Sequence, residues 1–151
     1  MPVIHISTRI RASLQRCFDL ARDLDLHVRS TEGTNEVAVA GITSGLIRAG
    51  ESVTWEATHF GIRQRLTSRI TEFDPPYHFR DSQVSGAFKS FDHDHYFSRD
   101  GEVTLMRDVF TYRAPLGILG RLADVLFLEA YMRKLLERRA EVIRRDAEGL
   151  S

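Results

Sequence analysis

Residues 53–70, VTWEATHFGIRQRLTSRI, decide the fold class of this sequence. Apolar residues alternate with polar ones on both sides of the Phe60-Gly61 turn: Val53, Trp55 and Ala57 before it, then Ile62, Leu66 and Ile70. Alternation with a period of two predicts antiparallel strands that have one buried face and one solvated face. The apolar face therefore needs a cover from elsewhere in the chain.

The same alternation extends over residues 35–112 and is interrupted at turn residues: Gly45, Gly50, Gly61, Asp74-Pro75-Pro76, Gly86 and Asp100-Gly101. Turns at this spacing predict a meander of consecutive antiparallel strands. Residues 3–10 predict a further strand. Ser13 is predicted to cap a helix, and a second short helical piece covers residues 24–28. We therefore expect about seven strands, with two short helices after the first strand.

The predicted cover is one long helix over residues 119–145, which begins after Pro115 and Gly117 end the sheet. Its apolar stripe consists of Leu122, Val125, Leu128, Met132, Leu135 and Val142. The opposite face is predicted to lie in solvent with local ion pairs, and its arginines are Arg133, Arg138, Arg139, Arg144 and Arg145. The predicted fold is thus α+β, a curved antiparallel sheet wrapped around a long C-terminal helix.

Length and composition narrow the function classes. The 151 residues predict one domain, residues 1–151. Lys plus Arg and Asp plus Glu both number 21, so no net field favours nucleic acid or an anionic membrane. Cys17 is the only cysteine, which excludes an internal disulfide and a four-cysteine zinc site. Because the N-terminus lacks a signal-peptide pattern and no apolar run could cross a bilayer, we expect a cytoplasmic protein without stable membrane insertion.

Strand parity places polar residues on the buried face of the predicted sheet. Counting from a turn at residues 98–102 pairs Phe97 with Thr104, His95 with Met106, His93 with Asp108 and Phe91 with Phe110. Counting back across the turn at residues 85–87 puts Asp81 near His93, Gln83 near Phe91 and Phe79 near His95. The resulting rows are Trp55, Leu66, Gln83, Phe91 and Phe110, mostly apolar, and Val53, Ser68, Asp81, His93 and Asp108, mostly polar.

Two interpretations of the polar row remain open. Two carboxylates beside one imidazole favour a protonated His93 in a structural ion-pair network. Alternatively, the row orients the polar end of a ligand whose apolar body lies against Trp55, Phe91, Phe110 and the long helix.

Metal and catalytic chemistry have less support in the sequence. His93-x-His95 places two imidazoles on one side of a strand, and His59 could add a third nitrogen. The register puts His59 at a strand end, away from His93, so we expect no metal and no cofactor. There is no G-x-S-x-G elbow, no catalytic cysteine context and no phosphate-binding glycine loop. Acid–base chemistry by Asp81, His93 and Asp108 on a bound carbonyl compound is the enzymatic alternative.

Six segments carry a resemblance to a known superfamily: FDLARD (18–23), EFDPP (72–76), FRD (79–81), GAF with FDHDHYF (86–97), YRAPLG (112–117) and LGRLAD (119–124). Together they resemble the START-like (SRPBCC) superfamily, which includes polyketide cyclases, the major birch-pollen allergen and lipid-transfer START domains. The last three are similar to a bacterial subgroup labelled cyclase/dehydrase-like, ligand-binding or cell-division-inhibitor-like. The resemblance covers nearly the whole chain and implies a helix-grip fold with a cavity between the sheet and the C-terminal helix.

The leading hypothesis is binding, for transport or sequestration, of a hydrophobic small molecule or lipid. Its predicted ligand-binding residues are Trp55, Leu66, Phe79, Asp81, Gln83, Phe91, His93, His95, Asp108, Phe110, Tyr112 and Met132. One alternative is a polyketide cyclase or dehydratase with His93 as proton shuttle and Asp81 or Asp108 setting its charge. Another is a regulatory interaction module that uses the sheet face of Arg63, Arg65 and Arg69, or the C-terminal helix. A homodimer is compatible with the sequence.

Overall fold

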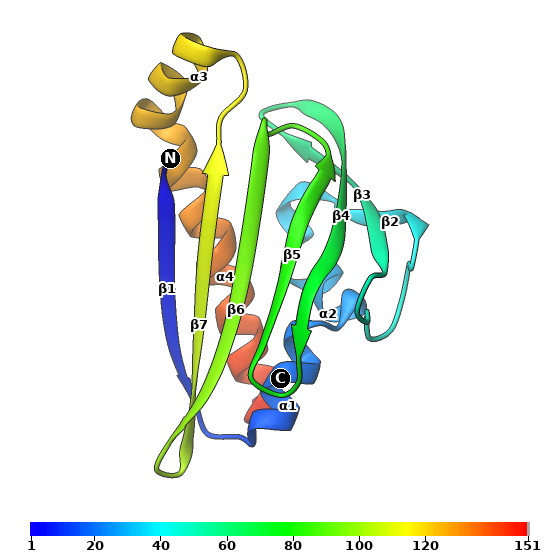
Figure 1. Ribbon diagram of the computed structural model, residues 1–151, viewed down its shortest axis with the longest axis vertical. Helices are drawn as coiled ribbons and strands as arrows, with labels where there is room; N and C mark the ends of the chain where they lie inside the picture. The colour runs from blue at the N-terminus through cyan, green and yellow to red at the C-terminus, as the bar shows by residue number, and fades with distance from the viewer. Residues whose placement is uncertain (151) are drawn as a thin grey trace.

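The computed structural model describes residues 1–150, and these contain one curved antiparallel sheet of seven strands (Figure 1). The strands are β1 (Val3–Ile10), β2 (Val37–Gly41), β3 (Ser52–His59), β4 (Ile62–Asp74), β5 (His78–Ser85), β6 (Ser90–Asp100) and β7 (Val103–Arg113). Their order in the sheet is β1-β7-β6-β5-β4-β3-β2, so consecutive strands from β2 to β7 are neighbours and β1 pairs with β7. The predicted α+β class, strand number and meander are confirmed.

Two short helices follow β1, and both were predicted. They are α1 (Leu14–Ala21) and α2 (Leu24–Ser30), and a 3-10 turn, η1 (Glu32–Thr34), leads on to β2. The side-chain oxygen of Ser13 caps α1 by accepting a hydrogen bond from the Arg16 amide at 3.2 Å. Cys17 on α1 is fully buried in the core, and burial raises the pKa of its thiol.

The C-terminal helical segment spans residues 117–147 and crosses the concave side of the sheet (Figure 1). It consists of α3 (Gly117–Ala123), the π-helical turn η2 (Asp124–Leu128) and α4 (Glu129–Ala147). α4 packs against β1, α1 and α2. Within residues 1–150, no helix combines the length and apolar character that crossing a membrane requires.

The apolar stripe predicted for this helix is wrong in its first half. Leu122 and Val125 are 57% and 82% exposed, and the buried stripe of α4 is instead Leu136, Arg139, Ala140, Ile143 and Ala147. The neighbouring apolar residues Ile118, Leu119 and Leu126 are also largely exposed, because α3 and the start of η2 extend beyond the sheet (Figure 1). Leu128, Met132 and Val142 of the predicted stripe are partly buried against the core.

Arg139 is a further correction to the sequence prediction. It was assigned to the solvated face, yet it is only 7% exposed. Leu136 lies three residues before it and Ile143 four residues after it, so all three share one helical face. The structure thus carries a positive charge into the interior from α4.

The strand register differs from the predicted one by two residues at two places. Across β6 and β7, His95 pairs with Asp108 and His93 with Phe110, because the strands continue to a two-residue turn at Gly101-Glu102. Across β4 and β5, bulges place Ile70 opposite Asp81. The predicted pairing of Asp81 with His93 is confirmed. A slip of two residues keeps every side chain on its predicted face.

The start of the C-terminal segment is held close to the end of β7. Gly120 packs on the main chain, and a Cβ at this position would lie 1.7 Å from the Pro115 carbonyl oxygen. The Tyr112 hydroxyl donates a hydrogen bond to the buried carboxylate of Asp124 in η2. These contacts fix where the helix enters the concave side of the sheet.

Candidate functional site

A cavity of about 560 Å³ lies between the sheet, α2 and the C-terminal segment. Its walls are mainly apolar and aromatic. Nine predicted ligand-binding residues line it: Trp55, Leu66, Phe79, Asp81, Phe91, His93, His95, Phe110 and Met132. Their role in binding a ligand stays a prediction.

Three predicted ligand-binding residues do not line the cavity. Gln83 donates a hydrogen bond to the Phe88 carbonyl oxygen at 2.8 Å, and so supports the loop between β5 and β6. Tyr112 is bonded to Asp124, and Asp108 lies behind the two histidines. Strand alternation predicts which face of the sheet a side chain lies on. Whether that side chain reaches the cavity depends on tertiary packing, which alternation does not predict.

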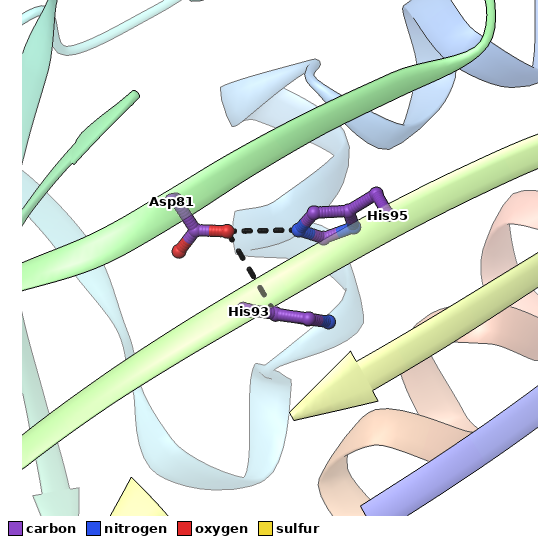
Figure 2. Close-up of side chains that lie close together, drawn as sticks. All are labelled: Asp81, His93 and His95. Carbon is purple, nitrogen blue, oxygen red and sulfur yellow. Dashed lines mark hydrogen bonds and ion pairs between the residues drawn. The ribbon is translucent and has the colours of Figure 1, made fainter. Parts of the chain in front are cut away.

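A group that we call the inner cluster forms the polar part of the cavity wall; it consists of Asp81, His93, His95, Asp108 and Arg139. Figure 2 shows its front, where both imidazoles approach the Asp81 carboxylate from the neighbouring strand. The Oδ1 atom of Asp81 lies 2.8 Å from Nε2 of His95 and 3.8 Å from Nδ1 of His93. The centroids of the two imidazole rings are 3.8 Å apart, and the ring planes are tilted by 32°.

Asp108 contacts the opposite nitrogens of the same two histidines. Its Oδ1 atom lies 2.9 Å from Nε2 of His93, 3.2 Å from Nδ1 of His95 and 3.4 Å from Nη1 of Arg139. Arg139 also donates a hydrogen bond from Nη2 to the Ala21 carbonyl oxygen at 2.6 Å. Asp108 therefore joins β6, β7 and α4 in one buried network.

Two buried polar atoms of this network lack a hydrogen-bond partner within residues 1–150: Nδ1 of His95 and Oδ2 of Asp108. His95 Nδ1 is close enough to Asp108 for an ion pair, but it is misaligned for a hydrogen bond. Unsatisfied buried polar atoms are uncommon and gather at functional sites. The inner cluster is thus incompletely satisfied by its own side chains.

The two histidines have opposite pKa shifts. Burial, together with the neighbouring His95, lowers the pKa of His93. For His95, contacts with Asp108 and Asp81 outweigh burial and raise the pKa. Burial opposes ionisation of Asp108 and Asp81, but bonds to the histidines outweigh it and lower both carboxyl pKa values. The same environment thus shifts the pKa values of two adjacent imidazoles in opposite directions.

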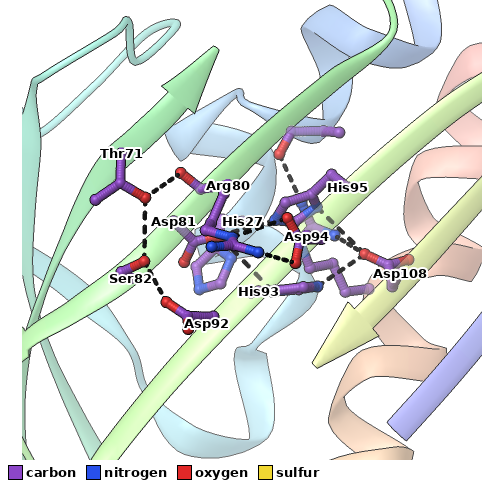
Figure 3. Close-up of polar contacts among 12 residues, drawn as sticks. His27, Thr71, Arg80, Asp81, Ser82, Asp92, His93, Asp94, His95 and Asp108 are labelled. Atoms are coloured by element: carbon purple, nitrogen blue, oxygen red, sulfur yellow. Dashed lines mark hydrogen bonds and ion pairs between the residues drawn. The ribbon is translucent and has the colours of Figure 1, made fainter. Parts of the chain in front are cut away.

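A second polar group, the outer cluster, lies on the other face of β4, β5 and β6 and consists of Glu72, His78, Arg80 and Asp94. Asp94 accepts hydrogen bonds from Arg80 at 2.9 and 3.0 Å and from His78 at 2.7 Å. Figure 3 draws Arg80 and Asp94 of the outer cluster together with Asp81, His93, His95 and Asp108 of the inner cluster. Strand alternation separates them, since neighbouring residues point to opposite faces.

The cavity opens to solvent between the β3–β4 turn and the C-terminal segment. Its apolar lining residues that are at least half exposed are Phe60, Ile62, Leu116, Leu119 and Phe127, which we call the mouth. The Phe60 ring packs against Phe127 and Tyr131, with centroids 5.8 and 4.6 Å apart. The turn and the helix therefore meet at one side of the opening.

His59 lies near the mouth and not in the inner cluster, as its predicted position at a strand end implies. Its Nδ1 atom is 2.6 Å from the Tyr131 hydroxyl. No sequence pattern identified His27, which lines the cavity, packs against Trp55 with the ring planes tilted by 34°, and pairs with Glu36. Arg139 was also not identified as a cavity residue. The available signal was its helical spacing, seven residues after Met132 and three after Leu136.

Comparison with known proteins gives structural matches. No protein-family model matches the sequence, and no curated protein matches it. The protein TTHA0849 from Thermus thermophilus is similar over 99% of both chains, with a TM-score of 0.79 and 21% identity. A START superfamily protein from Mycobacterium smegmatis is similar over 99% of both chains, with a TM-score of 0.70 and 13% identity. The major latex-like protein 151 from Panax ginseng covers 97% of both, with a TM-score of 0.69 and 16% identity.

At these identities the matches establish architecture, because one fold hosts many functions. They cover nearly the whole chain, as the resemblance seen in the sequence does. The sheet, the two short helices and the long C-terminal helix together give this chain the START-like helix-grip fold.

Proposed function

We propose that this protein binds a small hydrophobic molecule that has one polar end. The observation that carries the proposal is a cavity of about 560 Å³ whose apolar walls include the buried histidines of the inner cluster. Cavities of roughly 300–1,000 Å³ with a few convergent polar groups are typical of small-molecule sites. The helix-grip architecture supports the same function.

The charges of the inner cluster indicate what kind of polar end fits. The carboxylates of Asp81 and Asp108 already contact the two histidines, and Asp108 also contacts Arg139. An anionic ligand group would be buried beside the carboxylate of Asp81, which is strongly unfavourable. The favoured polar end is therefore an uncharged hydroxyl or carbonyl group, bonded to Asp81 or His93.

The test is mass spectrometry of an organic extract from the purified protein, compared with two tryptophan variants. Leu135 lines the cavity and is half-buried, so Leu135→Trp fills the space. Leu126 is 65% exposed and does not line the cavity, so Leu126→Trp is the matched control.

We expect one hydrophobic compound near one equivalent in the parent and the control, and its loss from Leu135→Trp. Equal amounts in all three proteins would contradict binding in this cavity. If the extracts are empty, titration with a panel of fluorescent lipophilic probes replaces them, and probe affinity unaffected by Leu135→Trp would contradict the proposal in the same way.

A cyclase or dehydratase activity is the second candidate, because a neutral imidazole faces the cavity beside a carboxylate. Burial and the neighbouring His95 lower the pKa of His93, which favours the unprotonated imidazole. An unprotonated imidazole can accept a proton from a bound carbonyl compound. Turnover of a polyketide-like substrate at the parental rate by both Asp81→Asn and His93→Gln would exclude this mechanism.

A further inference from the structure

The front of the inner cluster has the donor atoms of a metal site. Asp81, His93 and His95 each offer one atom, and these three atoms lie within 4.8 Å of one another. Two imidazoles and one carboxylate are a donor set used for zinc and for non-haem iron. The sequence pattern suggested only His59 as a third ligand, and the structure supplies Asp81 instead.

The distances suit coordination after small side-chain movements. A tetrahedral ion with bonds of about 2.0–2.1 Å keeps its ligand atoms roughly 3.3–3.4 Å apart. The two separations from Asp81 Oδ1 are 2.8 Å to His95 Nε2 and 3.8 Å to His93 Nδ1, which lie on either side of that value. The view in Figure 2 places all three side chains around one point.

Asp108 provides the support that metal-binding histidines usually have. A ligating histidine commonly donates its other ring N–H to a carboxylate, which fixes the tautomer and ring orientation. Asp108 Oδ1 lies 2.9 Å from His93 Nε2 and 3.2 Å from His95 Nδ1, the two nitrogens that face away from Asp81. One buried carboxylate thus orients His93 through a hydrogen bond and lies within ion-pair distance of His95.

The environment leaves access for the ion and for a further ligand. All three donor residues line the cavity, whereas Asp108 does not. Arg139 also lines the cavity, but its guanidinium is already engaged by Asp108 and by the Ala21 carbonyl oxygen. Coordination positions not filled by the protein would therefore face the cavity, as in catalytic metal sites.

From this arrangement we propose that Asp81, His93 and His95 bind one divalent first-row transition-metal ion, with Zn²⁺ as the best-suited ion. The proposal is independent of the organic ligand. Metal binding by a protein with an empty organic extract would support this site alone, and a bound lipid without metal affinity would support the proposed function alone.

The outer cluster is an internal control. Glu72, His78 and Asp94 also offer three donor atoms within 4.8 Å of one another. Arg80 already contacts both carboxylates, at 2.9 Å to Asp94 and 3.6 Å to Glu72. A metal ion would have to displace this guanidinium, so we infer no site there.

The experiment is calorimetric titration of tag-free, chelator-treated protein with Zn²⁺, together with visible absorption spectra in Co²⁺. We expect one ion per chain and the d–d bands of a low-coordinate Co²⁺ site. His93→Gln and Asp81→Asn should each weaken binding at least about tenfold, and Asp108→Asn by about 10–100-fold. His78→Gln should bind as the parent does.

The absence of saturable binding in the parent protein would overturn the proposal. So would binding that survives His93→Gln and is lost in His78→Gln. His93→Gln keeps the size and one hydrogen-bonding group of the side chain, so it serves as the decisive variant if Asp108→Asn does not fold.

Discussion

Strands β5 and β6 carry one polar cluster on each face, and the two clusters contain the same kinds of residue. On the outer face, Asp94 is bonded to Arg80 and His78 beside the half-exposed carboxylate of Glu72. On the inner face, Asp81 and the two histidines line a cavity, and Asp108 is almost completely buried.

The difference between them is one of surroundings. In the outer cluster, Asp94 is buried but its partners His78 and Arg80 are partly exposed, and the Arg80 guanidinium already contacts both carboxylates. The inner cluster keeps two buried polar atoms without a hydrogen-bond partner within residues 1–150, next to an apolar space. Only the inner cluster is therefore both costly to disrupt and available to a ligand.

The largest expected effect separates the clusters by stability. Asp108→Asn leaves the buried guanidinium of Arg139 without the carboxylate that it contacts and should lower the free energy of unfolding by about 3–5 kcal/mol. Asp94→Asn should lower it by about 1–2 kcal/mol, since its partners remain partly in water. Urea unfolding of both variants measures the two losses of free energy. Equal losses would contradict the conclusion that the inner cluster is more costly to disrupt than the outer cluster.

Low pH should reduce the difference in unfolding free energy between the parent protein and Asp108→Asn. The pKa of the Asp108 carboxyl is lower in the folded than in the unfolded protein, where it is about 3.9. Its stabilisation is therefore fully present above that value and is lost as the pH falls below it, by up to about 1.4 kcal/mol per pH unit. Urea midpoints of parent and Asp108→Asn should converge below about pH 4. A gap that stays constant down to pH 3 would contradict the assigned shift.

Ligand affinity should also differ between variants of the inner and outer clusters, with a smaller change in free energy than the stability effect. His93→Gln removes an imidazole from the cavity wall and should weaken binding of the co-purifying molecule about tenfold, equivalent to one lost hydrogen bond. His78→Gln, on the opposite face, should leave the affinity unchanged. Equilibrium titration of both variants provides the comparison, and a loss in His78→Gln alone would place the ligand elsewhere.

The smallest effect concerns the exposed start of the C-terminal segment. Leu122 was predicted to be in the core, but it is largely exposed and does not line the cavity. Leu122→Ser should therefore change the free energy of unfolding by no more than about 0.5 kcal/mol. A loss of about 2 kcal/mol or more in thermal or urea unfolding would indicate that Leu122 is buried in the core, as the apolar stripe predicted.

Much of the fold was predictable because its signals are local. Alternation in residues 53–70 identifies strands, and Ser13 identifies a helix start from its own neighbours. Strand parity also assigned Asp81, His93 and His95 to the buried face. That assignment survived a register error of two residues, because side chains repeat their orientation every two positions.

The interpretation of Arg63, Arg65 and Arg69 as a partner-binding face stays a prediction. Arg63 and Arg65 both contact Glu56, at 3.1 and 3.0 Å, so two of the three arginines are paired within the sheet.

The sequence by itself determined the helix-grip architecture and which strand faces are buried, since both depend on periodicity along short segments. Only the tertiary structure decided that Asp108 contacts both histidines, that Arg139 joins them and that the mouth lies beside α3. These contacts join residues distant in sequence, and a hairpin turn, two bulges and a π-helical turn determine their alignment. Each such irregularity shifts the strand register or helical phase of the residues after it, and local sequence patterns do not predict that shift.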